Sequence, residues 1–199
     1  MVTTIRPPII ALFAAIGLLM TACLPAPQPA KYPEISFRSA PPFQIDAAEI
    51  EVVEAYVPPL AAPHVEQNSP VPPSMLLRRW AEQRLEPTGV RGLVRATIQD
   101  ARIVETLLAT NQTVEGSFTN EQSARFDGRV AMTVELVGAN GLPTASVEGE
   151  AKRTRTLPEN ATLREREEIL FQMSEDLAND LDKVLDANIR QHFAPHLRQ

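Results

Sequence analysis

The sequence predicts an α+β fold, a two-layer sandwich in which a mainly antiparallel four-stranded sheet carries two helices on one face. Two long alternating segments separated by Asn140-Gly141 predict an antiparallel hairpin with one apolar and one polar face. Two other stretches repeat apolar residues every three or four positions, which predicts helices. The order is strand, helix, strand, strand, strand, helix, and both helices can bury their apolar stripes only if they share one face of the sheet.

The first strand is predicted near residues 48–56, where Ile50 and Val52 share one face. Pro58 and Pro59 would end it, because proline cannot donate a ladder hydrogen bond. A proline-rich loop is expected to follow.

The first helix is predicted near residues 73–86. Pro72 and Pro73 suit a first helical turn, where a missing N–H costs nothing, and Gly89 is the expected C-terminal cap. Trp80 should face the core, with a ligand-stacking role as the alternative. The residues that recur at helical spacing are Leu76, Leu77, Trp80, Ala81, Arg84 and Leu85.

Three strands are then predicted, at residues 93–108, 124–137 and 144–156. In the first of them, the alternation of apolar residues changes parity near Asp100, which is what a β-bulge would produce. Residues 109–122 are polar and should form a loop. The expected inward-facing residues are Val94, Ala96, Ile98, Ala101, Ile103 and Leu107, then Phe126, Gly128, Val130, Met132, Val134 and Leu136, then Ala145, Val147, Gly149 and Ala151.

The last helix is the longest element, and Thr162 with Glu165 forms a capping box at its start. Pro195 should end it. The opposite side of this helix is acidic and is most simply a solvated face, with a partner-binding surface as the alternative. The predicted apolar stripe is Leu163, Leu170, Met173, Leu177, Leu181, Val184 and Ile189, and the polar side carries Glu168, Glu175, Asp182 and Lys183.

The amino-terminal segment has the layout of a secretory signal. Arg6 precedes an apolar run from Ile9 to Met20, small residues follow, and the only cysteine, Cys23, stands directly behind them. A membrane-spanning helix is the alternative, but such a helix needs about 20 apolar residues, which is more than this run provides. A secreted protein with an incidental cysteine is the other alternative.

The stretch Leu19-Met20-Thr21-Ala22-Cys23 resembles the lipobox of bacterial lipoproteins, with Met20 where leucine is usual. The resemblance implies that the Cys23 thiol takes a diacylglycerol, that the signal is removed, and that the new amino terminus receives a fatty acid such as palmitate. The implied domains are a signal peptide at 1–22, a lipidated proline-rich tether at 23–42 and a single periplasmic domain at 43–199. Leu24, where an aspartate would retain the protein in the inner membrane, implies the periplasmic face of the outer membrane, with the inner membrane as the alternative.

The predicted order of elements also resembles small domains of proteobacterial envelope lipoproteins. These are the auxiliary lipoproteins of lipid-trafficking transporters and the lipoprotein plug of the lipopolysaccharide translocon. The segments Arg78-Arg79-Trp80-Ala81 and Arg164-Glu165-Arg166-Glu167 resemble a group of uncharacterised alphaproteobacterial lipoproteins. No site residue is implied by these resemblances.

The charge and the residue motifs argue against several functions. The net charge of −6 opposes a nucleic-acid partner, which would need a basic surface. His192 and His196 are four residues apart, but Pro195 lies between them and no further ligand completes a metal site. No nucleophile motif or phosphate-binding glycine loop appears. The sequence therefore predicts no enzyme, no cofactor and no metal.

One local group of cations stands out from the acidic average, and it consists of Arg125, Arg129, Lys152, Arg153 and Arg155. These residues lie on the two strands of the predicted hairpin, where they could meet the phosphate of a lipid or lipopolysaccharide. Cross-strand pairing with neighbouring carboxylates is the simpler interpretation.

We therefore expect a membrane-anchored lipoprotein that serves as a non-enzymatic binding or accessory subunit in envelope transport or assembly, with an unnamed envelope protein as partner. The alternative is a periplasmic domain that binds a lipid or small ligand between sheet and helices. A hydrolase of unrecognised type is a more distant alternative.

Overall fold

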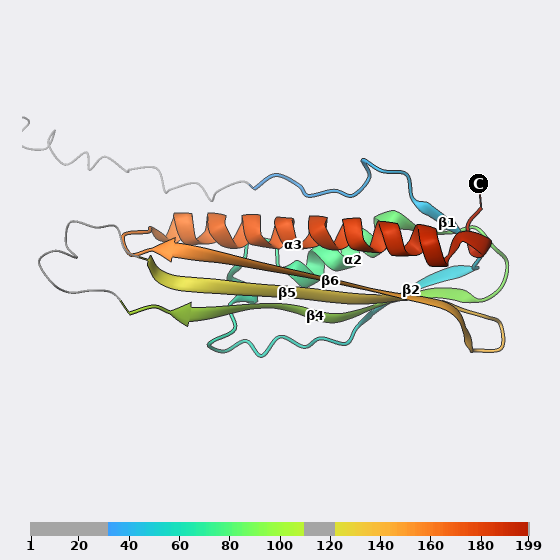
Figure 1. Ribbon diagram of the computed structural model, residues 1–199, viewed down its shortest axis with the longest axis horizontal. Coiled ribbons are helices and arrows are strands. Elements are labelled where there is room, and N and C mark those ends of the chain that lie inside the picture. Colours follow the sequence, from blue (N-terminus) through green and yellow to red (C-terminus); the bar gives the residue numbers. More distant parts are fainter. Residues whose placement is uncertain (1–31, 110–121, 199) are drawn as a thin grey trace, which may run out of the picture. The chain divides into compact units, whose positions relative to one another are not determined.

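The computed structural model describes residues 32–109 and 122–198. Two helices, α2 (Pro73–Arg84) and α3 (Leu163–His192), lie on one face of a four-stranded sheet (Figure 1). This sheet contains β2 (Glu49–Glu54), β4 (Leu93–Leu107), β5 (Gln122–Val137) and β6 (Pro143–Pro158), in that spatial order. The α+β class and the placement of both helices on one face are as predicted.

The sheet is mixed, because β2 pairs with β4 in parallel while β4–β5 and β5–β6 are antiparallel. The chain between β2 and β4 contains α2. A crossover of this kind returns the chain to the starting end of the sheet, so that the next strand runs parallel to the first. The sequence predicts the strands but not this direction.

A second, two-stranded sheet was not predicted. In it β1 (Phe43–Ile45) pairs in parallel with β3 (Leu85–Pro87), and β3 follows α2 without a loop. Gly89 is therefore not the cap of α2, as the sequence suggested; its N–H donates to the Ala47 carbonyl at 2.7 Å. Strands of three residues are too short to show a periodic pattern.

A β-bulge lies in β4 between Ile98 and Asp100, as predicted. Ile98 faces the helices and pairs with Met132, whereas Asp100 pairs with Ala131. The extra residue, Gln99, reverses the alternation, because successive side chains of a strand point to opposite faces.

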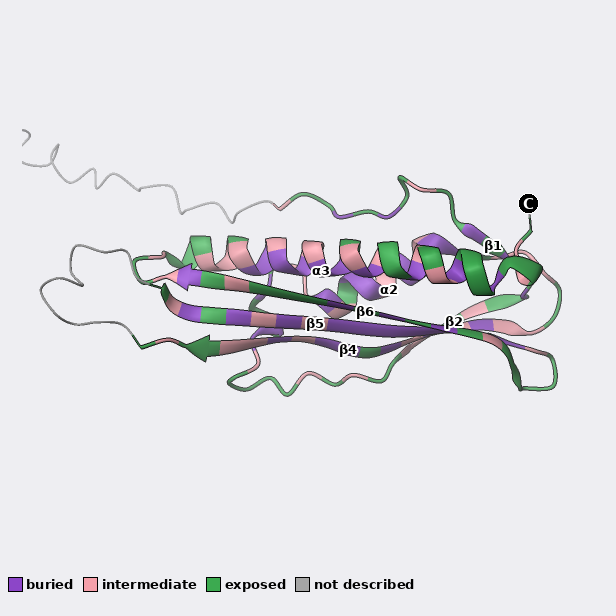
Figure 2. Ribbon diagram, in the orientation of Figure 1, coloured by how far each residue is buried: buried purple, intermediate pink, exposed green. Residues whose placement is uncertain are grey.

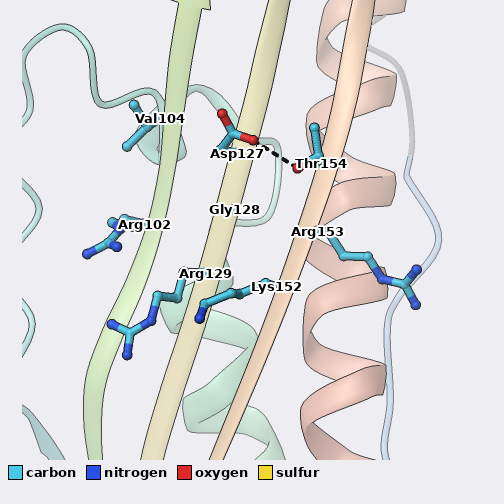
Figure 3. A pocket seen from close by; sticks show the side chains of 8 residues that line it. All are labelled: Arg102, Val104, Asp127, Gly128, Arg129, Lys152, Arg153 and Thr154. Carbon is cyan, nitrogen blue, oxygen red and sulfur yellow. Dashed lines mark hydrogen bonds between the residues drawn. The ribbon is translucent and has the colours of Figure 1, made fainter.

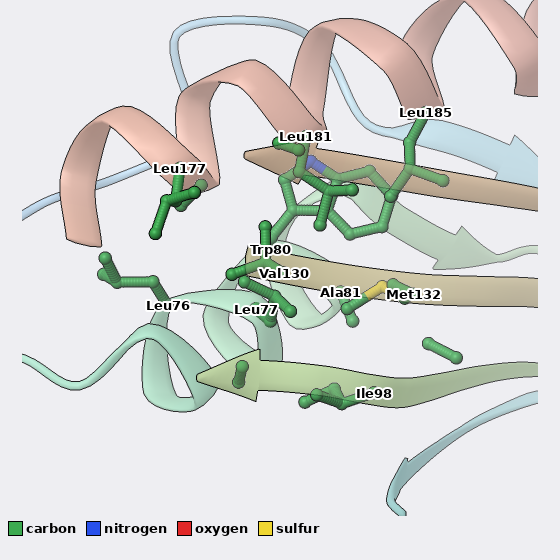
Figure 4. Packing of buried hydrophobic residues seen from close by; sticks show 14 of the residues in the cluster. Leu76, Leu77, Trp80, Ala81, Ile98, Val130, Met132, Leu177, Leu181 and Leu185 are labelled. Carbon is green, nitrogen blue, oxygen red and sulfur yellow. The ribbon is translucent and has the colours of Figure 1, made fainter. Parts of the chain in front are cut away.

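The core fills the layer between sheet and helices (Figure 4). Trp80 is buried there, as predicted. Two glycines let α3 come close to the sheet: a Cβ on Gly128 would lie 2.7 Å from Leu177 Cδ1, and one on Gly149 would lie 2.7 Å from Leu185 Cγ.

Helix α3 begins with the predicted capping box of Thr162 and Glu165, and its buried stripe faces the sheet (Figure 2). Two predicted stripe positions are wrong. Leu163 is exposed because it projects beyond the core at the first turn, and Leu185 takes the inward place assigned to Val184.

Asp182 was also assigned to the wrong side. It lies against α2, where its carboxylate accepts hydrogen bonds from Trp80 Nε1 at 2.6 Å and Arg84 Nε at 3.1 Å. Arg84 is the buried partner, with only 1% of its side chain exposed. A buried guanidinium needs compensating carboxylates, and this need could not be recognised from the periodicity of α3 alone.

The compact unit begins at Tyr32, within the segment predicted as tether. Residues 32–42, which we call the strap, pack on the two helices. Ile35 and Phe37 are buried, and the Tyr32 ring lies 4.7 Å from that of Phe171. Further along the strap, Arg84 Nη1 donates to the Pro41 carbonyl at 2.5 Å. The folded unit is thus larger than the predicted 43–199.

Candidate functional site

The five predicted cations of the hairpin are divided between the two faces of the sheet. Arg125, Arg129 and Lys152 belong to the outer face, which is the face opposite the helices. Arg153 and Arg155 reach instead to α3, where they form ion pairs with Asp180 and Asp176. The predicted strip is therefore not one surface.

The outer face carries a different row of cations, which crosses three neighbouring strands. Arg102 of β4 is paired in register with Arg129 of β5, and Arg129 is paired with Lys152 of β6. Residues that pair directly across strands share one face and lie close together. We call Arg102, Arg129 and Lys152 the cation row.

The β-bulge in β4 places Arg102 in this row. If Gln99 were instead paired in a regular ladder, the residues after Ile98 would have the opposite parity, and Arg102 would face the helices. The same shift puts Asp100 on the outer face, in register with Ala131 and, through it, with Glu150.

Two carboxylates next to the row hold its central guanidinium. Arg129 Nη1 donates to Asp100 Oδ2 at 2.5 Å, and its Nη2 donates to Glu150 Oε2 at 2.7 Å. Arg102 Nη1 lies 2.9 Å from the same Asp100 oxygen, and Lys152 pairs with Glu150. Three cations and two anions leave one net positive charge.

The pairing shifts the pKa values of Glu150 and Arg129. Hydrogen bonds from Arg129 and then Lys152 lower the pKa of Glu150 to about 2. The hydrogen bonds to Glu150 and Asp100 raise the pKa of Arg129 further above its ordinary value. Glu150 and Arg129 therefore both keep their charges at neutral pH.

An open groove of about 260 Å³ lies along the cation row (Figure 3). Beyond the row, Asp127 accepts a hydrogen bond from Thr154 Oγ1 at 2.8 Å and pairs with Arg125 on its other side. The side chain of Lys152 is 69% exposed and that of Arg102 is 44% exposed. These two ends of the row are separated by two strand spacings, roughly 10 Å.

A buried polar cluster supports the neighbouring edge of β4. The Glu66 carboxylate accepts hydrogen bonds from the Tyr56 hydroxyl at 2.7 Å and from the Ile103 backbone N–H at 3.1 Å, and His64 Nδ1 lies 3.5 Å from it. Burial, together with the Glu66 hydrogen bond, raises the pKa of Tyr56. The cluster holds residues 63–66 against β4, where His64 bridges to Val104.

The arrangement suits recognition of an anion. The groove offers guanidinium and ammonium donors and a threonine hydroxyl that is already bonded to Asp127. Within residues 32–109 and 122–198, no group of three or more His, Cys, Asp or Glu residues is arranged to hold a metal ion. His192 and His196 belong to no such group in that part of the chain.

Arg102 was not predicted as a site residue. The predicted parity shift near Asp100 was enough to place Arg102 on the outer face. The register that brings Arg102 opposite Arg129 could not be predicted from the sequence. Cys23 lies outside the described residues. Among the helices that the structure describes, none has the length and apolar character to cross a bilayer.

No family model and no curated protein matches this sequence. A minor lipoprotein from Acinetobacter baumannii is similar in structure at 11% identity and a TM-score of 0.39, over 78% of this chain and 98% of that chain. A proposed lipoprotein from Caulobacter crescentus CB15 is similar at 14% identity and a TM-score of 0.28, over 70% and 91%. Protein XCC0632 from Xanthomonas campestris, of the family model DUF330, is similar at 9% identity and a TM-score of 0.27, over 76% and 92%. At TM-scores below 0.5, these likenesses carry no inference about function.

Proposed function

We propose that this chain is an envelope lipoprotein, anchored through Cys23, that acts as a non-enzymatic binding or accessory subunit in envelope transport or assembly. The observation that carries the proposal is the position of Cys23, the only cysteine, directly behind an apolar run and small residues. Three acyl chains on one residue would anchor the protein durably, since two already suffice. Leu24 in place of aspartate favours the outer membrane over the inner one.

The segment after Cys23 supports the same proposal. Only eight residues, 24–31, separate Cys23 from the first residue of the compact unit, and three of them are prolines. So short a segment spans at most roughly 30 Å, so it would keep the folded unit close to the leaflet that holds the lipid.

The anchor is tested by membrane fractionation of cells that express the wild type or Cys23→Ala. We expect the wild type in the outer-membrane fraction with the mass of a triacylated chain starting at Cys23, and the variant released from it. Thr3→Ala, a change ahead of the apolar run, is the matched control and should behave like the wild type. A Cys23→Ala variant that still sediments with the outer membrane contradicts the proposal.

The accessory role is tested by crosslinking in intact cells, followed by purification of the lipidated chain. We expect one defined envelope protein to be captured, with the same crosslinked mass in repeated preparations. Recovery of the uncrosslinked chain alone, under conditions that crosslink a known envelope complex, contradicts the role.

A second candidate function is the binding of an anionic ligand, and the cation row favours it. Arg102, Arg129 and Lys152 stand side by side with one unneutralised positive charge in a protein that is acidic overall. A phosphate group could lie along the groove, hydrogen-bonded to Lys152 and Arg102 at its two ends. The ligand would bind on this surface and not between sheet and helices, where the described core side chains are packed.

This candidate is tested by titrating the purified chain with inorganic phosphate and with phosphatidylglycerol vesicles. We expect Lys152→Gln to weaken binding about tenfold, equivalent to about 1.4 kcal/mol. Arg95→Gln, which removes an outer-face cation outside the groove, should leave binding unchanged. Equal effects of the two variants would show only nonspecific attraction to cations, and the candidate would then be rejected.

A further inference from the structure

The strap enters the folded unit near the beginning of α3. Tyr32 stacks against Phe171, whereas Pro41 is held by Arg84, which also pairs with Asp182 and Asp186 further along α3. The strap therefore runs in the same direction as α3. The segment that leads back to Cys23 leaves the unit at the amino-terminal part of this helix.

Two exposed leucines project from the same end of the molecule. Leu163 is the first residue of α3 and is 73% exposed, and Leu107 is the last residue of β4 and is 79% exposed. Arg166 and Glu105 join these two elements just inside the leucines, through contacts of 2.6 and 2.8 Å. We call the end that carries Leu107 and Leu163 the tip.

Leu107 has the strand parity of a core residue and Leu163 has the helical spacing of one, yet no described residue covers them. Leu107 continues the inward-facing positions of β4, and Leu163 continues the apolar stripe of α3. The described core ends short of them, at residues such as Leu157 and Leu170. Apolar side chains in such positions are suited to contact another apolar surface.

The length of the tether decides which end of the molecule can meet the membrane. Nine residue steps separate Cys23 from Tyr32, which span at most roughly 30 Å. From Phe171, the start of α3 is about 12 Å away and its end at His192 is about 31 Å away. The end of the molecule near His192 could therefore touch the leaflet only if the whole tether were stretched back along the strap. The tip can reach the leaflet without full extension of the tether.

We propose that the tip lies against the lipid leaflet that holds the acylated Cys23, with Leu107 and Leu163 in contact with lipid. This inference rests on the proposed lipid anchor. The opposite end, which carries the β5–β6 turn around Leu142, then points away from the membrane. A partner in the periplasm would meet this distal end first.

The experiment uses the lipidated chain in phosphatidylethanolamine–phosphatidylglycerol vesicles. An acylated Cys23 has no free thiol, so a newly introduced cysteine is the single site for a fluorescent maleimide. Leu163→Cys reports on the tip, and Leu142→Cys is the matched control, since both positions are exposed leucines. The vesicles carry an energy acceptor on the lipid headgroup.

We expect the label at position 163 to be quenched by the acceptor at least about twofold more than the label at position 142, because the strands hold the two ends roughly 50 Å apart. Equal quenching, or stronger quenching at position 142, overturns the inference while leaving the anchor intact. Maleimide labelling of the wild-type chain at Cys23 overturns the anchor itself, and the inference with it.

Discussion

Gly149 determines how closely α3 lies on β6. A Cβ at this position would lie 2.7 Å from Leu185 Cγ and 2.9 Å from Leu181 Cδ1, and Leu185 is fully buried. We expect Gly149→Val to lower the free energy of unfolding by about 1–3 kcal/mol, as overpacked core sites do. Urea unfolding measures the change.

The control for this prediction is Gly141→Asn. Gly141 has a φ of 77°, a conformation that asparagine tolerates, and no atom lies within 4 Å of its added Cβ. A Gly149→Val protein as stable as this control would contradict the described closeness of helix and sheet.

Glu150 connects the cation row to the pH dependence of stability. Its pKa is about 2 in the folded protein, below the ordinary value, because Arg129 and then Lys152 donate to it. A carboxyl whose folded pKa is depressed stabilises the fold above its unfolded pKa, near 4.3, and this stabilisation is lost as the pH falls through about 2. We expect Arg129→Gln to raise the pKa of Glu150 more than Lys152→Gln does, as measured by NMR titration of the side-chain carboxyl carbon.

The reverse order of the two variants would mean that Lys152 is the main partner of Glu150. Because both side chains of the Glu150–Lys152 pair are exposed, the effect on global stability should be small.

At the scale of single residues, alternation along a strand was the most useful signal, and it was only partly used. Arg153 and Arg155 have the opposite parity to Lys152, so their orientation towards α3 could have been predicted. The pairing of Arg102 with Arg129 could not, because it depends on the register of β4 against β5. Nor could the burial of Arg84, whose carboxylate partners lie about 100 residues away in the sequence.

The bulge in β4 is the element on which the outer face depends. Deletion of Gln99 would let Asp100 follow Ile98 directly in the ladder, so that Asp100 and Arg102 would stay on the outer face while Ala101 and Ile103 would stay in the core. We expect the deletion variant to keep cooperative thermal unfolding, as measured by circular dichroism, because no side chain of β4 changes face.

Substitution of the same residue provides the control. Gln99 is exposed, so Gln99→Ala should change the free energy of unfolding by no more than about 0.5 kcal/mol. A deletion variant that loses cooperative unfolding would contradict the assignment of Gln99 as the extra residue of the bulge.

The long elements were predictable because each carries many repeats of its pattern. The capping box of α3, the bulge and the β5–β6 hairpin were all found from local spacing. The β1–β3 pair and the strap are short, and their backbone geometry depends on residues that are distant in the sequence. Local patterns contain no information about such contacts.

Arg84 joins three parts of the molecule. Its guanidinium contacts Asp182 and Asp186 of α3, the Pro41 carbonyl of the strap and, 4.7 Å away, the ring of Phe43. We expect Arg84→Leu to lower the free energy of unfolding by about 3 kcal/mol, because two partly buried carboxylates lose their partner. Urea unfolding measures this loss.

The same substitution should loosen the strap. Cleavage by trypsin after Arg38, followed by mass spectrometry, should become at least about tenfold faster if the strap loses about 1.4 kcal/mol of local stability. Arg91→Leu, which removes an exposed arginine, is the control. An unchanged cleavage rate in Arg84→Leu would show that Ile35 and Phe37 hold the strap by themselves.

The direction of the strap has a mechanical consequence. Tension applied from the lipid side would act first at Tyr32 and would be directed along the axis of the strap, since its contacts follow one another from Phe171 past Arg79 and Gln83 to Arg84. These contacts would then be sheared together instead of being peeled off one at a time. The joint between anchor and domain should therefore resist pulling more strongly than any one of its bonds.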